Sequence, residues 1–304
     1  MMDLDRTATD YFISLKQARG KVIRKLKSRE RNELSNKRTE MYNLAEKTNS
    51  ASPVVKALSK ASINQSDFPT HISLIPDGNR RWANDRELSV GEGYAAGAEV
   101  IKNFRKWSMV DNSVDIVSAF LMSTENIKRR PEDELSQLYG VFIDFFNGVA
   151  ENDFVHNNEI RHEVRGNEEA MELLPDDVTD SIEVMEEATS EYEENKMIFL
   201  LGYGSRDDIV RAAKRTSNPV IDGQLTVTEE GEDNNEFRQN LMLGDLPDAD
   251  LMIRTSERRI SNYMLYSNAY AEFIFKDNMW PSYSEGDFYQ DIYTFANRER
   301  RFGV

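Results

Sequence analysis

A short segment around residue 77 combines one carboxylate, one glycine and two arginines at a spacing that could hold a phosphate group. An apolar run at residues 71–75 leads into Pro76-Asp77-Gly78-Asn79-Arg80-Arg81-Trp82. A strand that enters a glycine-containing loop before a helix points backbone N–H groups at an anion, and arginines add charge-assisted hydrogen bonds. Asp77 is the one acid in this loop, which fits a carboxylate that holds a Mg²⁺ ion bridging the phosphates. A plain Asp-Gly-Asn turn is the alternative explanation.

Two further clusters of the same chemistry follow later apolar runs. Ser123-Thr124-Glu125-Asn126 and then Lys128-Arg129-Arg130-Pro131 come after residues 114–122, and Arg254 to Asn262 comes after residues 251–253. A solvated polar turn could explain either cluster alone. The carboxyl ends of parallel strands share one rim of a sheet, so three such clusters in an acidic protein predict a site for one or two diphosphates.

The elements that must position these clusters alternate between strand and helix. Apolar runs predict strands at 71–75, 114–122, 159–164, 196–201 and 251–253, and periodic runs predict helices at 92–110, 131–150, 177–195 and 206–215. This alternation favours an α/β fold, a single domain with a mainly parallel central sheet flanked by helices on both faces. Residues 217–235, rich in Gly, Asp and Glu, are predicted to form a loop.

Composition limits the classes of function. The 304 residues are 39% apolar and 30% charged, typical of a globular protein with a core. The absence of cysteine excludes disulfides, thiolate chemistry and Cys-ligated zinc, and three scattered histidines do not suggest a His cage. Any metal is therefore expected to have oxygen ligands, which suits Mg²⁺. A net charge of −16 argues against a nucleic-acid partner.

The first 67 residues differ from the rest and are expected to form a helical, partly basic extension with a linker, before a catalytic domain at 68–304. Residues 1–70 hold 14 Lys/Arg and 8 Asp/Glu, a charge of +6 that leaves −22 for the remainder. Residues 16–38 are either a solvated helix packed on the domain or a basic amphipathic helix resting on an anionic membrane. With no signal-peptide pattern, the expected location is cytoplasmic, with peripheral contact at the inner face of the membrane.

The three clusters together resemble the signatures of cis-prenyltransferases, the undecaprenyl and dehydrodolichyl diphosphate synthases. The resemblance begins with His-Ile-Ser-Leu-Ile-Pro-Asp-Gly-Asn-Arg-Arg-Trp at 71–82 and continues with Ser-Thr-Glu-Asn at 123–126. It extends through residues 250–262, Ala-Tyr-Ala-Glu at 269–272 and Asn-Arg-Glu-Arg-Arg-Phe-Gly at 297–303. The resemblance implies a Mg²⁺-dependent homodimer that condenses isopentenyl diphosphate with an allylic diphosphate. Its product is a long-chain cis-polyprenyl diphosphate, a glycosyl carrier lipid precursor.

The resemblance also implies a role for each matching residue. Asp77 is implied as catalytic metal ligand, Glu272 as second metal ligand and Asn126 as the catalytic residue that orients substrate. The implied substrate-binding residues are Gly78, Asn79, Arg80, Arg81, Trp82, Ser123, Thr124, Glu125, Arg129 or Arg130, Arg254, Arg259, Ile260, Ser261, Arg301 and Gly303. Residues 301–303 are expected to reach the neighbouring subunit's site.

The expected chemistry is ionisation of the allylic C–O bond, with Mg²⁺ and arginines stabilising the departing pyrophosphate. The isopentenyl double bond then attacks, and pyrophosphate oxygen or water takes the C2 proton, since the Asn126 amide is a poor base. The growing chain needs an apolar tunnel. Candidates that could equally be ordinary core are Val100, Ile101, Phe104, Val141, Phe142, Phe145 and Phe146.

The chain departs from the family pattern at positions that usually hold the allylic diphosphate. Val90 replaces an arginine and Tyr94 a histidine, whereas Arg80 stands where the family more often has glycine. The alternative function is a non-catalytic partner subunit of a heteromeric enzyme, a class that typically lacks the acid found here at Asp77. An Asp-Asp-Val-Thr-Asp run at 176–180 looks like a trans-prenyltransferase metal motif, but a helix start with acids in its first turn explains it.

Overall fold

The computed structural model describes residues 67–221 and 236–298, with residues 218–221 described by their backbone alone. Residues 68–283 form one compact unit, and residues 284–297 belong to a second unit. The predicted extension at 1–67 lies outside the described residues except for Asp67. No helix in the described ranges is both long and apolar enough to cross a membrane.

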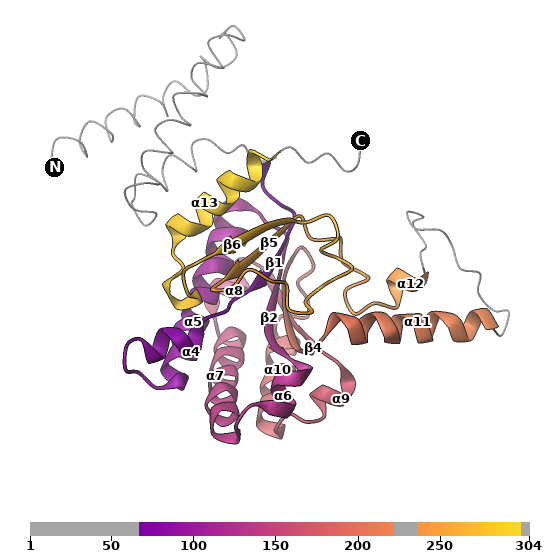
Figure 1. The fold of residues 1–304 in the computed structure, drawn as a ribbon, viewed down its shortest axis with the longest axis horizontal. Helices are drawn as coiled ribbons and strands as arrows, with labels where there is room; N and C mark the ends of the chain where they lie inside the picture. The colour runs from indigo at the N-terminus through magenta and orange to yellow at the C-terminus, as the bar shows by residue number, and fades with distance from the viewer. Residues whose placement is uncertain (1–66, 222–235, 299–304) are drawn as a thin grey trace, which may run out of the picture. The chain divides into compact units, whose positions relative to one another are not determined.

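A six-stranded sheet organises the described part of the larger unit (Figure 1). Its strands are β1 (His71–Ile75), β2 (Ile116–Ser123), β3 (Ile160–Arg165), β4 (Asn195–Tyr203), β5 (Leu251–Thr255) and β6 (Glu272–Lys276). They lie in the order β3-β4-β2-β1-β5-β6, and all five pairings are parallel. The predicted parallel α/β sheet is confirmed. Strand β6 was not predicted.

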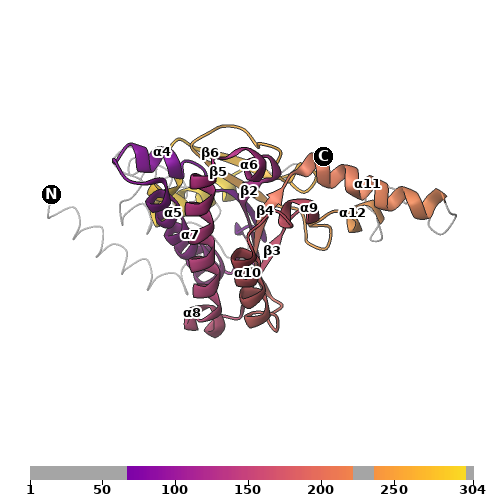
Figure 2. The same cartoon turned by 90° about the horizontal axis from the view of Figure 1, so that it is seen from below.

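Helices occupy the connections between these strands. The described helices of this unit are α4 (Asn79–Asn84), α5 (Val90–Arg105), the π-helix η2 (Lys106–Val110), α6 (Thr124–Arg129), α7 (Glu132–Ala150), α8 (Asp153–Asn157), α9 (Glu168–Met171), α10 (Asp176–Ala188), α11 (Ser205–Ile221), α12 (Glu236–Gln239) and the 3₁₀ turn η3 (Trp280–Ser282). Helices α5, α7 and α10 lie side by side along one face of the sheet (Figure 2).

The starts of the two longest of these three helices follow from local chemistry. Helix α5 begins with a capping box, in which the Ser89 side chain accepts from the Glu92 backbone N–H and Glu92 accepts from that of Ser89. Helix α7 begins after Pro131, and its first turn holds three acids that complement the helix dipole. Helix α10 ends at Ala188, seven residues before the predicted end. The predicted helix start at 176–180 is confirmed, with Asp176 and Asp177 in the first turn of α10.

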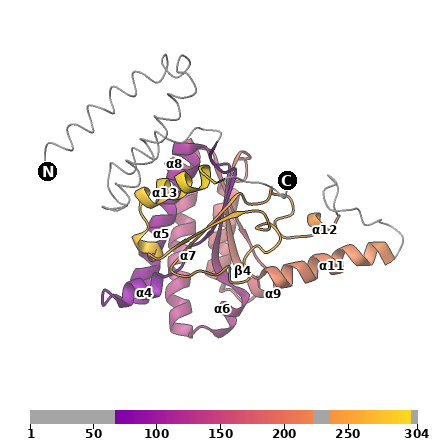
Figure 3. The ribbon, with the colours of Figure 1, turned by 45° about the horizontal axis from the view of Figure 1, so that its top comes forward.

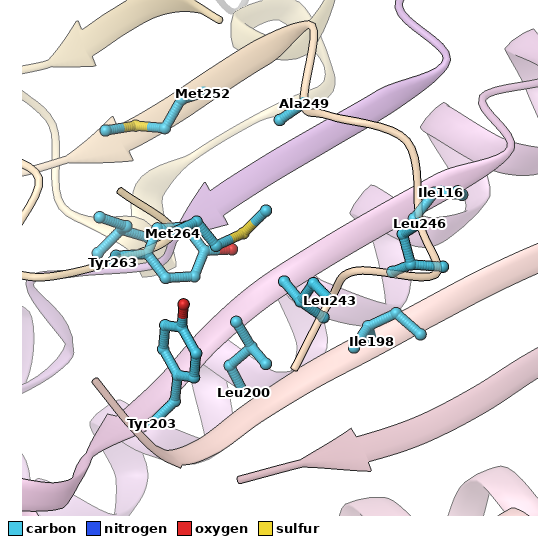
Figure 4. Close-up of a cluster of buried hydrophobic side chains, with 11 residues drawn as sticks. Ile116, Ile198, Leu200, Tyr203, Leu243, Leu246, Ala249, Met252, Tyr263 and Met264 are labelled. Atoms are coloured by element: carbon cyan, nitrogen blue, oxygen red, sulfur yellow. The ribbon is translucent and has the colours of Figure 1, made fainter. Parts of the chain in front are cut away.

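The opposite face of the sheet is covered by a compact hydrophobic cluster. Ile198 and Leu200 of β4 meet Leu243, Leu246 and other side chains from the segments after α12 and β5 (Figure 4). The next residue along β4, Phe199, instead contacts Phe145 of α7. Strand β4 is therefore buried on both faces, as parallel strands usually are.

The strand order places the centre of chemistry at β1. From β1 the chain moves to β2 on one side and later to β5 on the other, so the order changes direction at β1. Parallel α/β sheets bind ligands at such a point, beyond the carboxyl ends of the strands. The carboxyl ends of β1, β2 and β5, which carry the three predicted clusters, are thus neighbours. Helices α4 and α6, which follow β1 and β2, lie at the same end of the sheet (Figure 3).

Helix α13 (Glu285–Ala296) belongs to the second unit. It starts with a capping box between Ser284 and Asp287, and Phe288, Ile292 and Phe295 are buried along one stripe. Spacings of three and four residues are typical of an amphipathic helix.

Candidate active site

Asp77 stands at the end of β1, where backbone and side-chain contacts fix its position. Its N–H donates to Thr255 Oγ1 at 3.0 Å, and Thr255 Oγ1 donates back to the Asp77 carbonyl at 2.7 Å. The Asp77 carboxylate accepts from Arg254 Nη2 at 2.9 Å and lies 3.4 Å from Arg81 Nη2. The predicted acid therefore faces two arginines.

Glycine is required at position 78 because three segments of the chain approach each other closely there. It has a φ of 105°, and a Cβ built there would lie 2.3 Å from Ser256 Oγ and 2.9 Å from Met279 Cβ. Only glycine combines this backbone conformation with so little space. Its N–H donates to Asp77 Oδ1 at 2.6 Å, so this amide already supports the carboxylate instead of pointing free toward an anion.

The end of β2 presents Ser123 and Asn126 as a pair. Ser123 is the N-cap of α6: its hydroxyl accepts from the Asn126 N–H and donates to Asn126 Oδ1 at 2.7 Å. This exchange fixes the amide at the pocket wall. A shift in strand register between Phe120 and Met122 marks a bulge beside the pair, a feature common next to active sites.

Arg130, and not Arg129, faces the site. Arg130 stands just before α7, four residues ahead of Glu134, with 3.4 Å between Arg130 Nε and Glu134 Oε1, and its Nη1 donates to Tyr94 Oη at 2.9 Å. Arg129 is exposed in the last turn of α6. Of the two arginines, only Arg130 lines the cavity, and substrate contact by either stays a prediction.

The end of β5 gathers arginines around a second carboxylate, Glu257. Arg254 donates to Ser261 Oγ and to the Arg259 carbonyl, both at 2.5 Å, and to Glu257 at 2.8 Å. Glu257 also pairs with Arg259 and lies 3.5 Å from Arg81. The loop contains several left-handed residues, among them Ser256 and Ser261, which bend it back over the strand end.

These groups line one cavity of about 520 Å³. Among the described residues, its charged lining consists of Arg80, Arg81, Arg130, Arg254 and Arg259 together with Asp77 and Glu257. Five cations against two anions make the mouth positive although the protein is strongly acidic overall. Such a local reversal attracts a polyanionic ligand.

The cavity continues from the charged mouth into an apolar tunnel beside α5 and α7. Its lining includes Ala98, Ile101, Leu138, Val141, Phe142, Phe145, Phe146 and Phe199. Phe199 meets Phe145 edge to face, with ring centroids 5.4 Å apart, and tilts against Phe146 at 5.8 Å. Phe146 lies twelve residues beyond Glu134 in α7, about 18 Å along the helix. These three rings form the aromatic end of the tunnel.

Two predicted tunnel residues belong elsewhere. Val100 and Phe104 are buried core residues of α5 that do not line the cavity. Phe104 stacks obliquely with Trp280 and Tyr283, at centroid distances of 5.9 and 6.0 Å. The helical stripe on α5 was predicted correctly as apolar, but it serves both the core and the tunnel.

Several predicted substrate-binding residues also lie outside the cavity lining. Trp82 packs under the Arg86 guanidinium, and its Nε1 donates to Ser282. Thr124 Oγ1 donates to the Gly202 carbonyl on β4, whereas Glu125 is exposed. Ile260 packs against the hydrophobic cluster on the opposite face of the sheet. Substrate contact by these residues stays a prediction without support from the cavity.

Glu272, predicted as a metal ligand, lies far from Asp77 within this chain. It pairs with Leu251 at the amino end of β5, and its carboxylate accepts from Arg298 at 2.7 Å. Asp77 follows the opposite, carboxyl end of β1. Arg301 and Gly303 lie outside the described residues, so their predicted role in a neighbouring site is not tested.

Glu134 and Glu257 were not predicted as site residues. Both stand in charge-rich segments where a carboxylate looks like an ordinary solvated side chain. The signal that could have identified Glu134 is its position four residues after Arg130, which allows an ion pair across the start of α7.

Comparisons with known proteins agree with this architecture. Residues 75–303 match the family model described as "Putative undecaprenyl diphosphate synthase". The chain is 36% identical over 254 residues to a tritrans,polycis-undecaprenyl-diphosphate synthase (geranylgeranyl-diphosphate specific) of Thermoplasma acidophilum, which covers 83% of this chain and 96% of that protein. It is 37% identical to an isoprenyl transferase of Thermotoga maritima, over 78% of this chain and 97% of the relative.

Two solved structures share the fold. Lavandulyl diphosphate synthase from Lavandula x intermedia, in complex with dimethylallyl diphosphate, superimposes with a TM-score of 0.70 at 27% identity, over 79% of this chain and all of that one. A probable undecaprenyl diphosphate synthase from Campylobacter jejuni gives a TM-score of 0.61 at 30% identity, over 78% of this chain and 99% of the other.

Proposed function

This chain belongs to the undecaprenyl diphosphate synthase family of cis-prenyltransferases, and on that premise we propose which reaction it performs. It condenses isopentenyl diphosphate with an allylic isoprenyl diphosphate, repeatedly and with Mg²⁺, to give a long-chain cis-polyprenyl diphosphate. Geranylgeranyl diphosphate is the proposed primer, because several relatives are named as specific for it.

The observation that carries this proposal is the two-part cavity. A mouth with five arginines opens into a tunnel that ends in three phenylalanines. This combination fits a ligand with a diphosphate head and a hydrocarbon tail, because charged donors bind the head and apolar walls bury the tail. A nucleotide has no hydrocarbon tail that could fill such an apolar tunnel.

The residues at the mouth fit a magnesium ion. Asp77 supplies a carboxylate, and the buried Asn79 Oδ1 has no hydrogen-bond partner among the described residues. The described part of the chain contains no group of three or more His, Cys, Asp or Glu residues that could hold a metal. The single carboxylate of Asp77 suits Mg²⁺, which commonly takes one or two carboxylates and completes its shell with substrate phosphates. Asp77 would hold the ion, which stabilises negative charge on the leaving pyrophosphate.

Isopentenyl diphosphate is assigned to the β5 side of the mouth. Arg254, Arg259 and Ser261 are mutually hydrogen-bonded there, so their donors are preorganised for one diphosphate. Arg254 Nε is buried without a hydrogen-bond partner in the described residues and remains available for an anion oxygen. Asn126, held by Ser123, orients the substrate, and pyrophosphate oxygen or water accepts the C2 proton.

A homodimer is also proposed. The distance of Glu272 from Asp77 within one subunit means that its predicted metal role requires a second subunit, as does the proposed role of Arg301 and Gly303. The alternative of a non-catalytic partner subunit is disfavoured by Asp77, which stands in the mouth with its supporting contacts intact. Cytoplasmic location with membrane contact through the basic segment at 16–38 remains part of the proposal.

The direct test is incubation of the pure protein with geranylgeranyl diphosphate, radiolabelled isopentenyl diphosphate and Mg²⁺. Chromatography of the extracted lipid should show labelled products much longer than the primer, with double bonds of cis geometry by NMR. Farnesyl diphosphate in a parallel reaction tests primer choice, and chelation of the metal should stop incorporation. Absence of incorporation with either primer, by protein that is folded by circular dichroism, would contradict the proposed activity.

A further inference from the structure

Glu134 of α7 lies behind the cavity wall and contacts three residues that line the cavity. Its Oε2 accepts from Arg80 Nη1 at 3.0 Å, and its Oε1 accepts from Tyr94 Oη at 2.7 Å. Tyr94 Oη in turn accepts from Arg130 Nη1 at 2.9 Å. Glu134 itself is 8% exposed and does not line the cavity. One buried carboxylate therefore connects two arginines that reach the mouth from different elements.

We propose that Glu134 is the positioning residue of the allylic diphosphate-binding site. It acts by fixing the side chains of Arg80 and Arg130 in one arrangement. This inference rests on the proposed function and names the residue that organises one half of its site. The two guanidinium groups repel each other, and each has several free rotations. The shared Glu134 carboxylate offsets the repulsion between the two guanidinium groups and restricts their rotation before substrate arrives. Binding of the diphosphate therefore costs less side-chain entropy.

The net charge of these side chains favours binding of a diphosphate, because Glu134 does not fully neutralise the two arginines. Two arginines and one glutamate leave a net charge of +1, and both glutamate oxygens are already occupied by donors that lie on the cavity side. The carboxylate is thereby shielded from an incoming diphosphate. Arg80 remains half exposed, with its side chain 55% accessible, and can turn its other donors to the ligand.

Tyr94 transmits the effect of Glu134 to Arg130. Burial raises the pKa of the Tyr94 hydroxyl well above its ordinary value, although Arg130 opposes this shift. The hydroxyl therefore keeps its proton at any working pH and can donate to Glu134 while accepting from Arg130. The Arg130 guanidinium also lies over the Tyr94 ring, 5.8 Å from its centroid.

The test compares Glu134→Gln, Tyr94→Phe and the double variant with wild type. Binding of geranylgeranyl diphosphate, without isopentenyl diphosphate so that no turnover occurs, is measured by calorimetry. The KM for isopentenyl diphosphate is measured separately at saturating primer. Glu134→Gln should weaken primer binding about tenfold, or about 1.4 kcal/mol, and Tyr94→Phe about threefold. The KM for isopentenyl diphosphate should change less than twofold in both.

The double variant should be no weaker than Glu134→Gln alone, because both changes break one path. Glu132→Gln, an exposed change of the same charge in the same helical turn, should leave both constants unaltered. If Glu134→Gln fails to fold, Tyr94→Phe carries the test, since it removes only a hydroxyl. Unchanged primer binding, or equal weakening for both diphosphates, would overturn the positioning role. Wild-type protein that binds no primer would instead overturn the proposed function, and this inference with it.

Discussion

Arg254 Nη2 donates a hydrogen bond to Asp77 Oδ2 at 2.9 Å, across the neighbouring carboxyl ends of β5 and β1. The Arg254 side chain is 4% exposed and contacts Glu257 with the same nitrogen. The acid assigned to the metal and the arginine assigned to isopentenyl diphosphate therefore orient each other. A change at either residue must disturb the other.

Replacement of Asp77 by alanine should lower turnover by about 10³-fold, about 4 kcal/mol of transition-state stabilisation, because it removes the proposed metal ligand. It also leaves Arg254 without one partner, so Asp77→Asn is the sharper variant: it keeps the shape and an oxygen acceptor. Incorporation of labelled isopentenyl diphosphate measures both. Asp85→Asn, at an exposed site just beyond α4, is the control. A tenth of wild-type activity in Asp77→Asn would contradict the metal role.

The aromatic end of the tunnel should limit product length. Phe199→Leu opens the contact with Phe145 and Phe146 while the wall stays apolar, so the product distribution should shift to longer chains. Reversed-phase chromatography of the products measures the shift. Phe104→Leu is the matched control, since this buried ring lies outside the tunnel lining and its loss should lower stability alone. An identical distribution from Phe199→Leu would remove this ring from length control.

Much of the fold was predictable because strand and helix periodicities differ clearly in this chain. Strand β1 was predicted at its observed bounds, and β4 was found although it begins one residue earlier and ends two residues later than predicted. Strand β6 was missed because its five residues stand in an aromatic-rich run without clear turn signals. Helix α10 was predicted too long, since the acids after Ala188 are as compatible with a helix as with the turn that is present.

Shared active sites can be tested by mixing inactive subunits. If Arg301 completes the partner's site, Asp77→Ala and Arg301→Ala subunits form mixed dimers in which one site carries both lesions and the other none. Random exchange makes about half of the dimers mixed, so about a quarter of wild-type activity should return. Native mass spectrometry verifies the exchange. Mixed dimers without activity would show that each tail serves its own subunit.

The basic segment at the start of the chain should bind anionic lipid. Deletion of residues 1–60 should abolish co-sedimentation with vesicles containing phosphatidylglycerol, since it removes 14 Lys/Arg and 7 Asp/Glu, a charge of +7, and leaves a body of −23. Turnover of short, water-soluble primers should remain largely intact. High salt should release the full-length protein, because the attraction is electrostatic. Equal sedimentation of both forms would return the segment to a solvated helix packed on the domain.

Two buried histidines should make stability fall in mild acid. Burial lowers the pKa of His71 to about 4 and, together with Arg105, that of His162 to about 3. A histidine has a pKa near 6.5 when unfolded, so the unfolded state binds more protons between these values. The stabilisation is complete above pH 6.5 and is lost as the pH falls toward 4 and 3, at up to about 1.4 kcal/mol per pH unit for each histidine.

Denaturant unfolding of wild type and His162→Asn between pH 7 and pH 4 measures this effect. The variant is expected to be less stable at pH 7, because Arg105 Nη1 loses its contact with His162 Nε2 at 2.9 Å. The difference in unfolding free energy should then shrink as the pH falls. A constant difference would contradict a neutral buried imidazole.

The candidate site could be predicted where the type of a residue alone indicates its chemistry. It could not be predicted where the role of a residue depends on which distant residues the fold brings into contact with it. Asp77 and Arg254 were predicted because acids and arginines at strand ends suggest phosphate binding, and Ser261 was predicted from the family resemblance; all three line the cavity. Glu134 was not, because its importance comes from Arg80, which is 54 positions away in the chain. Neither local pattern nor composition reports such a pairing.

Helix α7 carries Glu134, the proposed positioning residue, in its first turn, and Phe145 and Phe146 of the tunnel lining near its last. Glu134 and Phe146 therefore belong to one rigid rod, whose length is set by the number of residues between them. Each additional helical turn between the two residues increases their separation by about 5.4 Å. Insertion of one turn between these residues would move Phe146 away from Glu134 by that distance, so product length would change in steps without alteration of any group at the reacting centre.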